Sequence, residues 1–543
     1  MRAIDVDTAR SSFIIDQAVA ALRTGDPAEA ERLLRHRSLQ APTDVAALAK
    51  LADIVVEQGR IVEATLLLRR ILAVAPAHHG IRLSLARLHQ QLAEFAVALA
   101  ELEALPGAIR ESFEVTALEA ALLGQIGRHD QELALYELLV EREPANASLW
   151  MSYGNALKTV GRTGEAVAAM RAAIKARPTY GEAYWSLANL KTVRFDDGDI
   201  AAMRKALRSK LDPIDALHFN FALGKALEDR RRFADSFRHY AAGNRIRHAD
   251  IPPAFLTVTP RVEVVVQTLT ADLFDRCEGA GDPTPDPIFI VGLQRSGSTL
   301  VEQILASHPH IEGTAELLAM EQIWARVGGM GPSGNPFLEV TRLQADALRG
   351  LGAEYLDRVR PFRSTDRPFF VDKLPANWLN AGFIRLILPN AKIIDARRHP
   401  MACGFSNFKQ HYASGVTFAY DLRSIGIFYR DYVRMMDHID MVQPGSVHRL
   451  VNERLIDDPE GEVRRLLDYL GLPFDSACLD FHRNRRAVNT PSAEQVRRPL
   501  NRDGVDSWRP YEPWLAPLAE ALGPALEHWD ATRPVVGCSG AAY

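Results

Sequence analysis

The residues best suited to chemistry begin with a loop in the second half of the chain. Gly292 and Gly297 stand five positions apart and are followed directly by Ser298 and Thr299. The apolar run at 288–291 favours a buried parallel strand before the loop, and apolar residues at helical spacing follow it. Backbone N–H groups at the start of a helix bind anions. The sequence therefore predicts a site for a phosphate-like group.

The spacing of this loop matches the nucleotide-binding pattern G-x-x-x-x-G-K-[ST], except that Ser298 occupies the lysine position. That lysine contacts the β- and γ-phosphates of a triphosphate, and here it is absent. Arg295 instead adds a cation that can bind an anion through two nitrogens. We therefore expect a nucleotide with a compact anion at its 5′ end. A nucleotide-dependent kinase of the P-loop type is the alternative, which Ser298 disfavours.

Further charged residues follow short apolar stretches downstream of the loop. Glu316 follows a turn at 308–311, Lys373 follows FFV, and Arg398 follows the strand-like KIIDA. Ser406 comes eight residues after Arg398. Of the adjacent pair Arg397 and Arg398, one is expected to form a structural ion pair. We expect His308 to be a turn residue and His399-Pro400 to begin a helix.

These blocks together resemble the sulfotransferases that use 3′-phosphoadenosine 5′-phosphosulfate (PAPS), and in particular the tyrosylprotein sulfotransferase branch. The resemblance covers about residues 285–510, and it implies a P-loop-like α/β domain with a parallel sheet. It implies that the 5′ end of PAPS binds Arg295, Ser296, Gly297, Ser298 and Thr299. It implies that Arg398 and Ser406 bind the 3′-phosphate. Ser492 and the stretch 495–508 resemble the segment that closes over the cofactor.

The same resemblance implies a set of catalytic residues. Glu316 would be the general base, a role worth about 10²–10⁴-fold in rate. Lys373 and Arg295 would stabilise charge on the transferring group, each at about 3–4 kcal/mol. Two positions depart from the family pattern: Asn452 stands where a tyrosine is typical, and Leu317 follows Glu316 where tyrosylprotein enzymes carry a basic residue.

The resemblance implies transfer of a sulfuryl group from PAPS to an acceptor hydroxyl, and the chain shows no residue spacing typical of a metal site. A protein tyrosine, a sugar and a small phenol all offer an oxygen nucleophile, so the acceptor stays open between a protein and a small hydroxyl compound. A non-catalytic repeat scaffold is a further alternative. It is disfavoured because Glu316, Lys373, Arg398 and Ser406 are all present.

The first half of the chain has an internal period that must organise it into helices. Turn positions recur every 34 residues, and an alanine, or once a glutamate, follows each five residues later; the turns are Gly25, Gly59, Ala93, Gly127 and Gly161. Pro76, Pro144 and Pro178 fall in phase with this spacing. A degenerate copy follows near 219–244. The period and residue order resemble the tetratricopeptide repeat.

The predicted fold class is therefore α + α/β, with an all-α tetratricopeptide solenoid at 1–250 and a sulfotransferase domain at 285–535. A helical stretch and a turn-rich linker at 251–284 would separate the two. A solenoid offers a concave binding face rather than chemistry. We expect the repeats to recruit the acceptor or to mediate self-association into an oligomer.

Composition limits the remaining function classes. The 543 residues include 64 Lys and Arg against 68 Asp and Glu, a net charge of −4, which gives no basic field for nucleic acid. No apolar run is long enough to span a membrane. Four cysteines, at 277, 403, 478 and 538, are too few and scattered for a disulfide framework. The amino-terminal sequence predicts a helix rather than a signal peptide, so the cytoplasm is the expected compartment.

Overall fold

The computed structural model describes residues 2–190, 193–329, 335–413, 415–488, 490, 492–493 and 495–530, without the side chains of 2–10 and 315. Cys538 and the last residues of the predicted second domain lie outside these. Two compact units divide the chain, Met1–Pro144 and Ala145–Tyr543. The predicted α + α/β architecture is confirmed, since among the described residues helices alone precede residue 287 and a parallel five-stranded sheet follows it.

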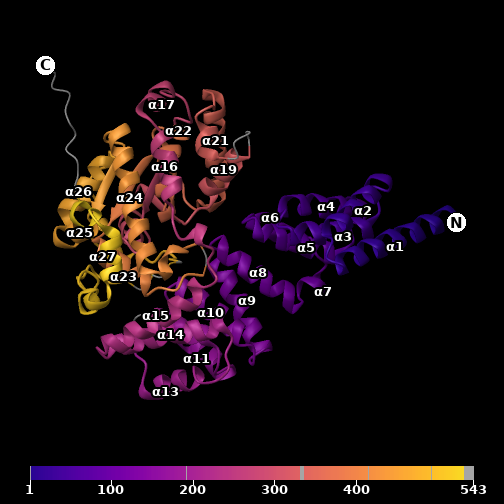
Figure 1. Cartoon of the computed structure of the whole chain (residues 1–543), viewed down its shortest axis with the longest axis horizontal. Coiled ribbons are helices and arrows are strands. Elements are labelled where there is room, and N and C mark those ends of the chain that lie inside the picture. The colour runs from indigo at the N-terminus through magenta and orange to yellow at the C-terminus, as the bar shows by residue number, and fades with distance from the viewer. Residues whose placement is uncertain are drawn as a thin grey trace. The chain divides into compact units, whose positions relative to one another are not determined.

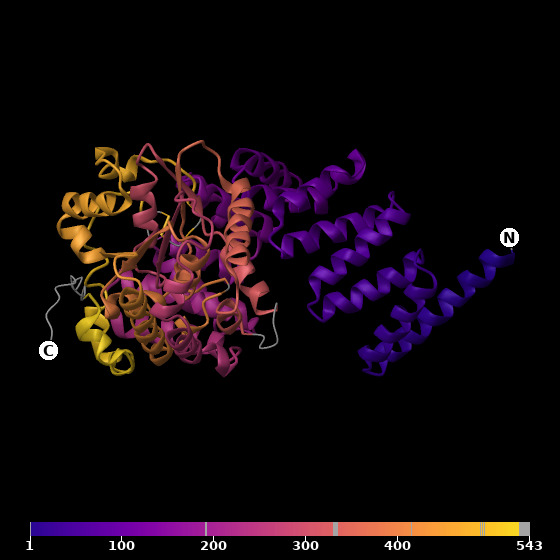
Figure 2. The same cartoon turned by 90° about the horizontal axis from the view of Figure 1, so that it is seen from above.

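The first unit consists of helices that pair in sequence order, as Figure 2 shows. They are α1 (Arg2–Arg23), α2 (Pro27–Gln40), α3 (Val45–Glu57), α4 (Ile61–Val74), α5 (His79–Gln91), α6 (Phe95–Glu103), α7 (Gly107–Arg110), α8 (Phe113–Gln125) and α9 (His129–Arg142). Small buried residues let each pair approach closely: Ala30, Ala64 and Ala98, each at the same place after its turn, are all 0% exposed. The helical pairing that the 34-residue period predicts is therefore present.

Each predicted turn residue adopts the left-handed backbone that ends the first helix of a pair. The φ angles are 82° at Gly25, 75° at Gly59, 78° at Gly127 and 83° at Gly161. Ala93 takes the same conformation, with φ 56°, although it carries a Cβ. In all five cases the next helix begins two residues later. The period is thus a property of the backbone as well as of the sequence.

One repeat replaces the buried alanine by a carboxylate. Glu132 is 9% exposed, and its Oε2 lies 2.8 Å from Nδ1 of His129. A Cβ on Gly124, in the partner helix, would lie 2.4 Å from Oε1 of Glu132. The glycine therefore makes room for the larger side chain, and the histidine gives it a polar partner.

The second unit begins with more repeat helices and continues into the linker. These helices are α10 (Ala147–Thr159), α11 (Thr163–Ala176), α12 (Gly181–Asn189), α13 (Asp197–Ala206), α14 (Pro213–Asp229), α15 (Phe233–His248), α16 (Thr259–Thr268) and α17 (Ala271–Arg276). The degenerate copy predicted near 219–244 is the α14–α15 pair, whose turn residue Arg231 has φ 57°. Helices α16 and α17 lie in the apolar stretch of the predicted linker.

The sheet has the strand order β2-β3-β1-β4-β5, and every neighbouring pair is parallel. Its strands are β1 (Pro287–Gly292), β2 (Ile311–Ala315), β3 (Phe369–Asp372), β4 (Lys392–Arg397) and β5 (Val447–Val451). Because all strands run the same way, every loop that leaves a carboxyl end lies along one edge. That edge is where ligands bind in open parallel sheets.

Helices cover both faces of the sheet. They are α18 (Ser298–Leu305), α19 (Ala319–Gly328), α20 (Pro336–Val340), α21 (Ala345–Val359), α22 (Ala381–Ile387), α23 (Pro400–Phe408), α24 (Leu422–Val442), α25 (Asn452–Asp457), α26 (Pro459–Leu470), α27 (Ala516–Leu522) and α28 (Ala525–His528), most of them labelled in Figure 1. Short 3₁₀ segments lie at Pro253–Phe255, Arg360–Phe362, Pro375–Asn380, Phe418–Tyr420, Ser476–Cys478, Phe481–Arg483 and Arg509–Trp514.

Alternate residues of the central strand belong to two different cores. Ile288 and Ile290 pack with apolar residues of α18 and α26. Phe289 and Val291 belong to a core that includes α21, α22 and α24 and extends without a break into α10–α15. The repeat helices after residue 145 therefore share a core with the sheet, which explains why they form one compact unit with it.

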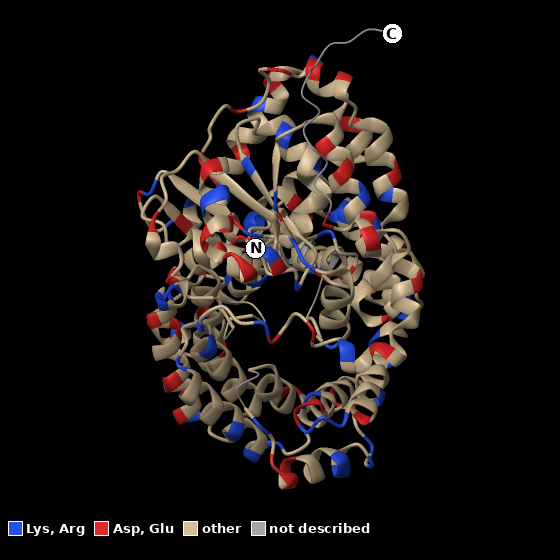
Figure 3. Cartoon of the chain, turned by 90° about the vertical axis from the view of Figure 1, so that its left-hand side faces the viewer, with Lys and Arg blue, Asp and Glu red and all other residues tan. Residues whose placement is uncertain are grey.

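Two global properties follow from the described residues. Over that part of the chain no helix combines the length and apolar character that crossing a bilayer needs. Figure 3 shows Lys and Arg interspersed with Asp and Glu along the helices in view. Cys277, Cys403 and Cys478 are free thiols.

Candidate active site

Residues from all five strands meet at the carboxyl edge of the sheet. The glycine loop follows β1, and Glu316 and Lys373 follow β2 and β3. Arg398 follows β4, and Asn452 follows β5. Adjacent parallel strands place the residues after them side by side. The sheet thus gathers residues that are up to 160 positions apart in sequence.

The loop after β1 is packed so tightly that both glycines are required. Gly292 has φ 145°, and a Cβ there would lie 2.4 Å from the carbonyl oxygen of Ala396. Gly297 has φ 102°, and its Cβ would lie 2.8 Å from Oδ1 of Asn452. Asn452, which departs from the family pattern, therefore lies against the loop. Larger residues at either glycine would force the loop away from β4 or β5.

The hydroxyls of the loop differ in their surroundings. Ser296 is 2% exposed, and within the described residues its Oγ has no hydrogen-bond partner. Ser298 and Thr299 open α18, and Oγ1 of Thr299 lies 3.3 Å from Oγ1 of Thr490. A buried hydroxyl without a partner is costly unless a ligand completes it. Ser296 is therefore well placed to bind an anion in the loop.

Arg295 connects three segments that carry predicted cofactor residues. Its backbone is left-handed, with φ 69°. Its guanidinium donates to Oγ of Ser406 at 3.1 Å, to Oγ of Ser492 at 2.8 Å and to Oε1 of Gln495 at 3.4 Å. The structure thus brings Arg295, Ser406 and Ser492 into direct contact. In this arrangement the guanidinium faces the C-terminal segment.

The two adjacent arginines after β4 have different environments. Arg397 is fully buried and pairs with Asp395 at 2.8 Å, so it forms the expected structural ion pair. Arg398 instead donates to the backbone carbonyls of Arg295, at 3.1 Å, and of Gly504. Burial lowers the pKa of Arg398, and its Nε lacks a hydrogen-bond partner among the described residues. Arg398 therefore joins the glycine loop to the C-terminal segment and retains a donor for a ligand.

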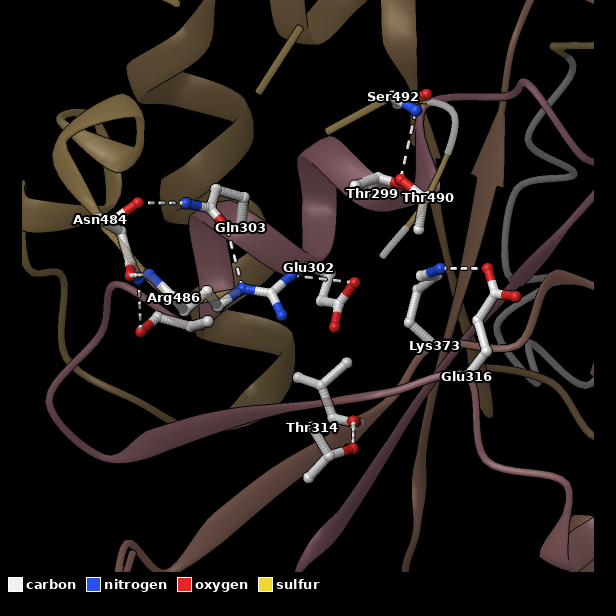
Figure 4. A network of polar contacts seen from close by, with 12 residues as sticks. Thr299, Glu302, Gln303, Thr314, Glu316, Lys373, Asn484, Arg486, Thr490 and Ser492 are labelled. Atoms are coloured by element: carbon white, nitrogen blue, oxygen red, sulfur yellow. Dashed lines mark hydrogen bonds and ion pairs between the residues drawn. The ribbon is translucent and has the colours of Figure 1, made fainter. Parts of the chain in front are cut away.

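Glu316 and Lys373 form an ion pair at the ends of β2 and β3 (Figure 4). The Lys373 side chain is 1% exposed, whereas the Glu316 side chain is 46% exposed. Asp372, directly before the lysine, is buried and accepts a 2.8 Å hydrogen bond from Tyr355, and burial raises its pKa to about 7. The Glu316 carboxylate of the ion pair therefore faces outward, whereas the Lys373 ammonium faces inward.

Two linked hydrogen bonds that the sequence did not indicate hold the backbone of the loop after β1. Nδ2 of Asn407 donates to the carbonyl of Gln294 at 2.7 Å, and the Tyr412 hydroxyl donates to Oδ1 of Asn407 at 2.7 Å. Burial raises the pKa of Tyr412 far above its usual value. The charge of Arg295 acts to lower this pKa, and the charge of Glu316 acts to raise it. The one sequence signal is that Asn407 directly follows Ser406.

The segment after residue 484 is fixed to α18 by buried polar contacts (Figure 4). Nη2 of Arg486 lies 3.0 Å from Oε2 of Glu302, and its Nε donates to Gln303 at 2.8 Å. Gln303 in turn donates to the carbonyl of Asn484 at 2.9 Å. Thr490 and Ser492 then reach the loop. These contacts fix the start of the segment that carries Ser492.

Other candidate features belong to the framework. His308 contacts the carbonyl of Pro473 at 3.0 Å and accepts from the N–H of His310, as expected of a turn residue. Pro400 begins α23, as the His399-Pro400 pair predicted. A pocket of about 370 Å³ is lined mainly by apolar side chains of α18, α26 and 478–500. Pro499 and Leu500 of the predicted stretch 495–508 line it, but none of the individually predicted site residues does. The described residues contain no cluster of His, Cys, Asp or Glu suited to a metal ion.

Two family models match parts of the sequence. Residues 287–476 match the model of the sulfotransferase family, and residues 55–122 match that of the tetratricopeptide repeat. The second half of the chain therefore contains a stretch that matches the sulfotransferase family, and the first half contains one that matches the tetratricopeptide repeat.

Three individual proteins that resemble this chain have low sequence identity to it. An uncharacterized protein of Aquifex aeolicus (strain VF5) is 30% identical over 392 residues, which are 70% of this chain and 51% of that protein, so this chain spans about half the length of that relative. Protein-tyrosine sulfotransferase 1 of Danio rerio is 26% identical over 247 residues, 41% of this chain and 65% of that protein. The sulfotransferase domain of the Synechococcus PCC 7002 olefin synthase is 22% identical and covers 46% of this chain and 97% of that domain, with a TM-score of 0.34.

Proposed function

We propose that this protein transfers the sulfuryl group of PAPS to an acceptor hydroxyl. The observation that carries the proposal is the meeting of an anion-binding loop, a buried arginine and a lysine–glutamate pair at one edge of the sheet. The match to the sulfotransferase family supports the same conclusion. The proposal includes PAPS as donor and Glu316 as base.

The residues of the loop and the second basic turn fit such a donor. Ser296 offers a buried hydroxyl and Arg398 a buried Nε, neither with a protein partner in the described chain. Gly297 leaves space that a Cβ would fill beside Asn452. When bound, PAPS would supply a sulfuryl group on an activated phosphosulfate bond. The loop N–H groups, Ser296, Ser298 and Thr299 would bind its 5′ end, and Arg398 and Ser406 its 3′-phosphate.

The lysine–glutamate pair would carry the chemistry. Glu316 keeps nearly half of its side chain open, so an acceptor can reach it, and its carboxylate would take the proton of the acceptor hydroxyl. Lys373 is held inside, where its N–H groups would stabilise charge that grows on the leaving oxygen. Arg295 adds positive charge from within the loop itself. The products would be a sulfate ester and adenosine 3′,5′-bisphosphate.

A protein tyrosine is the acceptor to test first, because a relative named protein-tyrosine sulfotransferase 1 aligns with 41% of this chain. Sugars and small phenols are the other acceptors in the test. The repeats are proposed to recruit the acceptor, since tetratricopeptide arrays bind partners on their surfaces.

The direct test has two parts. Calorimetry compares adenosine 3′,5′-bisphosphate with ATP–Mg²⁺, and transfer of radiolabelled sulfate from PAPS is then measured for the wild type and variants. We expect Glu316→Gln to lower kcat by about 10²–10⁴-fold and Lys373→Ala by about 10²–10³-fold, with the bisphosphate still bound. Arg398→Ala should weaken bisphosphate binding, and Glu321→Gln, at an exposed position, should change nothing. Tighter binding of ATP than of the bisphosphate would refute the proposal.

A further inference from the structure

A turn of the repeat region contacts the segment that carries Ser492. The carbonyl oxygen of Thr159, the last residue of α10, accepts hydrogen bonds from the N–H of Val488 at 3.1 Å and from Nη2 of Arg497 at 3.0 Å. Carbonyls in the last turn of a helix lack partners within the helix and bear partial negative charge. An arginine is therefore a favourable partner for the Thr159 carbonyl.

The turn that follows Thr159 is shaped to receive Arg497. At Gly161 a Cβ would lie 2.8 Å from Cζ of Arg497, so the guanidinium rests directly on the glycine. The equivalent turns of earlier repeats are open, since a Cβ on Gly25, Gly59 or Gly127 would meet nothing within 4 Å. The contact thus distinguishes one turn from three others with nearly the same backbone.

The two contacts to Thr159 bracket the residues that reach the donor loop. Between Val488 and Arg497 lie Thr490, whose hydroxyl is 3.3 Å from that of Thr299, and Ser492, which accepts from Arg295 at 2.8 Å. Val488 is 2% exposed, so this end of the segment is buried as well as hydrogen-bonded. Fixing both ends of a short segment to one atom restricts where its middle can lie.

We propose that Arg497 is a positioning residue of the donor site, and that the α10–α11 turn of the repeats is the surface on which it acts. By docking on Thr159 and Gly161 beside Val488, Arg497 holds Thr490 and Ser492 against the loop. The repeat region then contributes to nucleotide affinity without touching the nucleotide. The inference rests on the proposed function, because it takes adenosine 3′,5′-bisphosphate and PAPS as the ligands of the loop.

The first test uses the full chain with Arg497→Ala and, as its matched control, Arg498→Ala, whose side chain is exposed. We expect Arg497→Ala to raise the Kd of adenosine 3′,5′-bisphosphate and the KM of PAPS about tenfold, as suits the loss of a charged hydrogen bond, with kcat changed less than threefold. Arg497→Lys, which can still donate to Thr159, should recover most of the affinity. Equal constants for Arg497→Ala and Arg498→Ala would overturn the inference.

A second test needs no nucleotide. Hydrogen exchange of the peptide containing Val488 should be faster in Arg497→Ala than in the wild type or Arg498→Ala; unchanged exchange would overturn the docking.

A third test changes the turn itself. Gly161→Ala should weaken bisphosphate binding, whereas Gly127→Ala, with equal backbone strain but an open turn, should not. Equal effects of the two variants would also count against the inference. If the wild type binds no bisphosphate, the proposed function fails, while the exchange experiment still decides whether Arg497 docks the segment.

Discussion

The repeat helices before residue 144 and those after it share one spacing but have different neighbours. In the first unit the buried side chains of the repeats form cores of their own. In the second unit the side chains of α10–α15, such as Tyr184 and Phe221, join the core on one face of the sheet. The repeat pattern therefore fixes how helices pair. The residues on their outer surfaces decide whether a pair stays in an array or packs into the unit that contains the sheet.

The contacts that make this difference are specific. Ser236 of α15 lies 2.9 Å from the hydroxyl of Tyr511, and Phe237 stacks between Phe408 and Trp514. Glu228 of α14 pairs with Lys409 at 2.7 Å. Burial raises the pKa of that carboxyl, but Lys409, Tyr240 and Lys225 together bring it below its usual value. These residues lie next to α23, the helix that carries Ser406. The last repeats are thus bonded to an element of the candidate site.

Truncation should produce the largest effect. A chain of residues 145–543 should fold and bind adenosine 3′,5′-bisphosphate, because it retains the whole of one compact unit. A chain of residues 251–543, cut at the predicted limit of the solenoid, loses α14 and α15 and exposes the core they cover. It should aggregate or lose its cooperative transition in thermal unfolding followed by circular dichroism. Equal melting temperatures for the two truncated chains would contradict this account.

A single buried amide should have the next largest effect. Nδ2 of Asn244 donates to the carbonyl of Phe408 at 2.7 Å, across the boundary between α15 and α23. Asn244→Ala leaves that carbonyl without its donor and should cost about 1–3 kcal/mol in the free energy of unfolding. The matched control is Asn220→Ala, whose amide bonds within the repeat pair, to Ala216 and His239. Urea unfolding should show a smaller loss for the control, and equal losses would remove the distinction.

The same boundary should weaken in acid. His411 contacts His218 and Phe221 of α14, and its Nδ1 lies 3.1 Å from the Tyr420 hydroxyl. Burial, aided by the charges of His218 and Arg247, lowers the pKa of His411 to about 3. Between pH 6.5 and 3 the unfolded chain therefore binds a proton that the folded chain does not, so stability falls as the pH falls.

His411→Gln should flatten that dependence. Urea unfolding at pH 7.5 and at pH 5 measures it, with His36→Gln at an exposed position as the control. The remaining slope should come from the other histidines whose pKa values are lowered by burial, which are His218, His239, His399 and His448. A slope as steep in His411→Gln as in the control would show that this ring does not titrate with folding.

The smallest effect concerns the array alone. Ala93 occupies a turn with φ 56°, a conformation that costs a residue with a Cβ about 1–2 kcal/mol. Ala93→Gly should therefore raise the free energy of unfolding of the first unit by up to about 1 kcal/mol, after the greater chain entropy of glycine is subtracted. Gly59→Ala should lower it by a similar amount. Differential scanning calorimetry of both variants checks the pair of opposite signs, and two shifts of the same sign would contradict it.

Much of the fold could be predicted because its signals are local. The 34-residue period specified the helical turns, and the apolar runs before Gly292 and Lys373 marked β1 and β3. The site residues Glu316, Lys373 and Arg398 could be singled out because each follows a strand, where parallel topology gathers side chains. Their roles stay predictions until nucleotide binding and transfer are measured.

The rest depends on contacts that no spacing reveals. Asn407 supports the loop through a backbone carbonyl, and Arg497 reaches Thr159 across 338 positions. Every residue type has a backbone carbonyl that can accept a hydrogen bond. A contact to such a carbonyl therefore leaves no recognisable pair of residue types in the sequence. Strand alternation, by contrast, could have assigned the adjacent arginines. Asp395 and Arg397 are two apart on β4 and point to the same side, as their ion pair requires.

The strand order has a consequence for how the protein is made. Each repeat pair closes within a few tens of residues, so the first unit can fold as it leaves the ribosome. The central strand β1 must wait for β3 and β4. The loop after it does not receive Ser492, and Arg398 does not receive the carbonyl of Gly504, until those residues emerge. A growing chain therefore displays finished repeats long before the carboxyl edge of its sheet is complete, and a partner that binds the repeats early meets an unfinished candidate site.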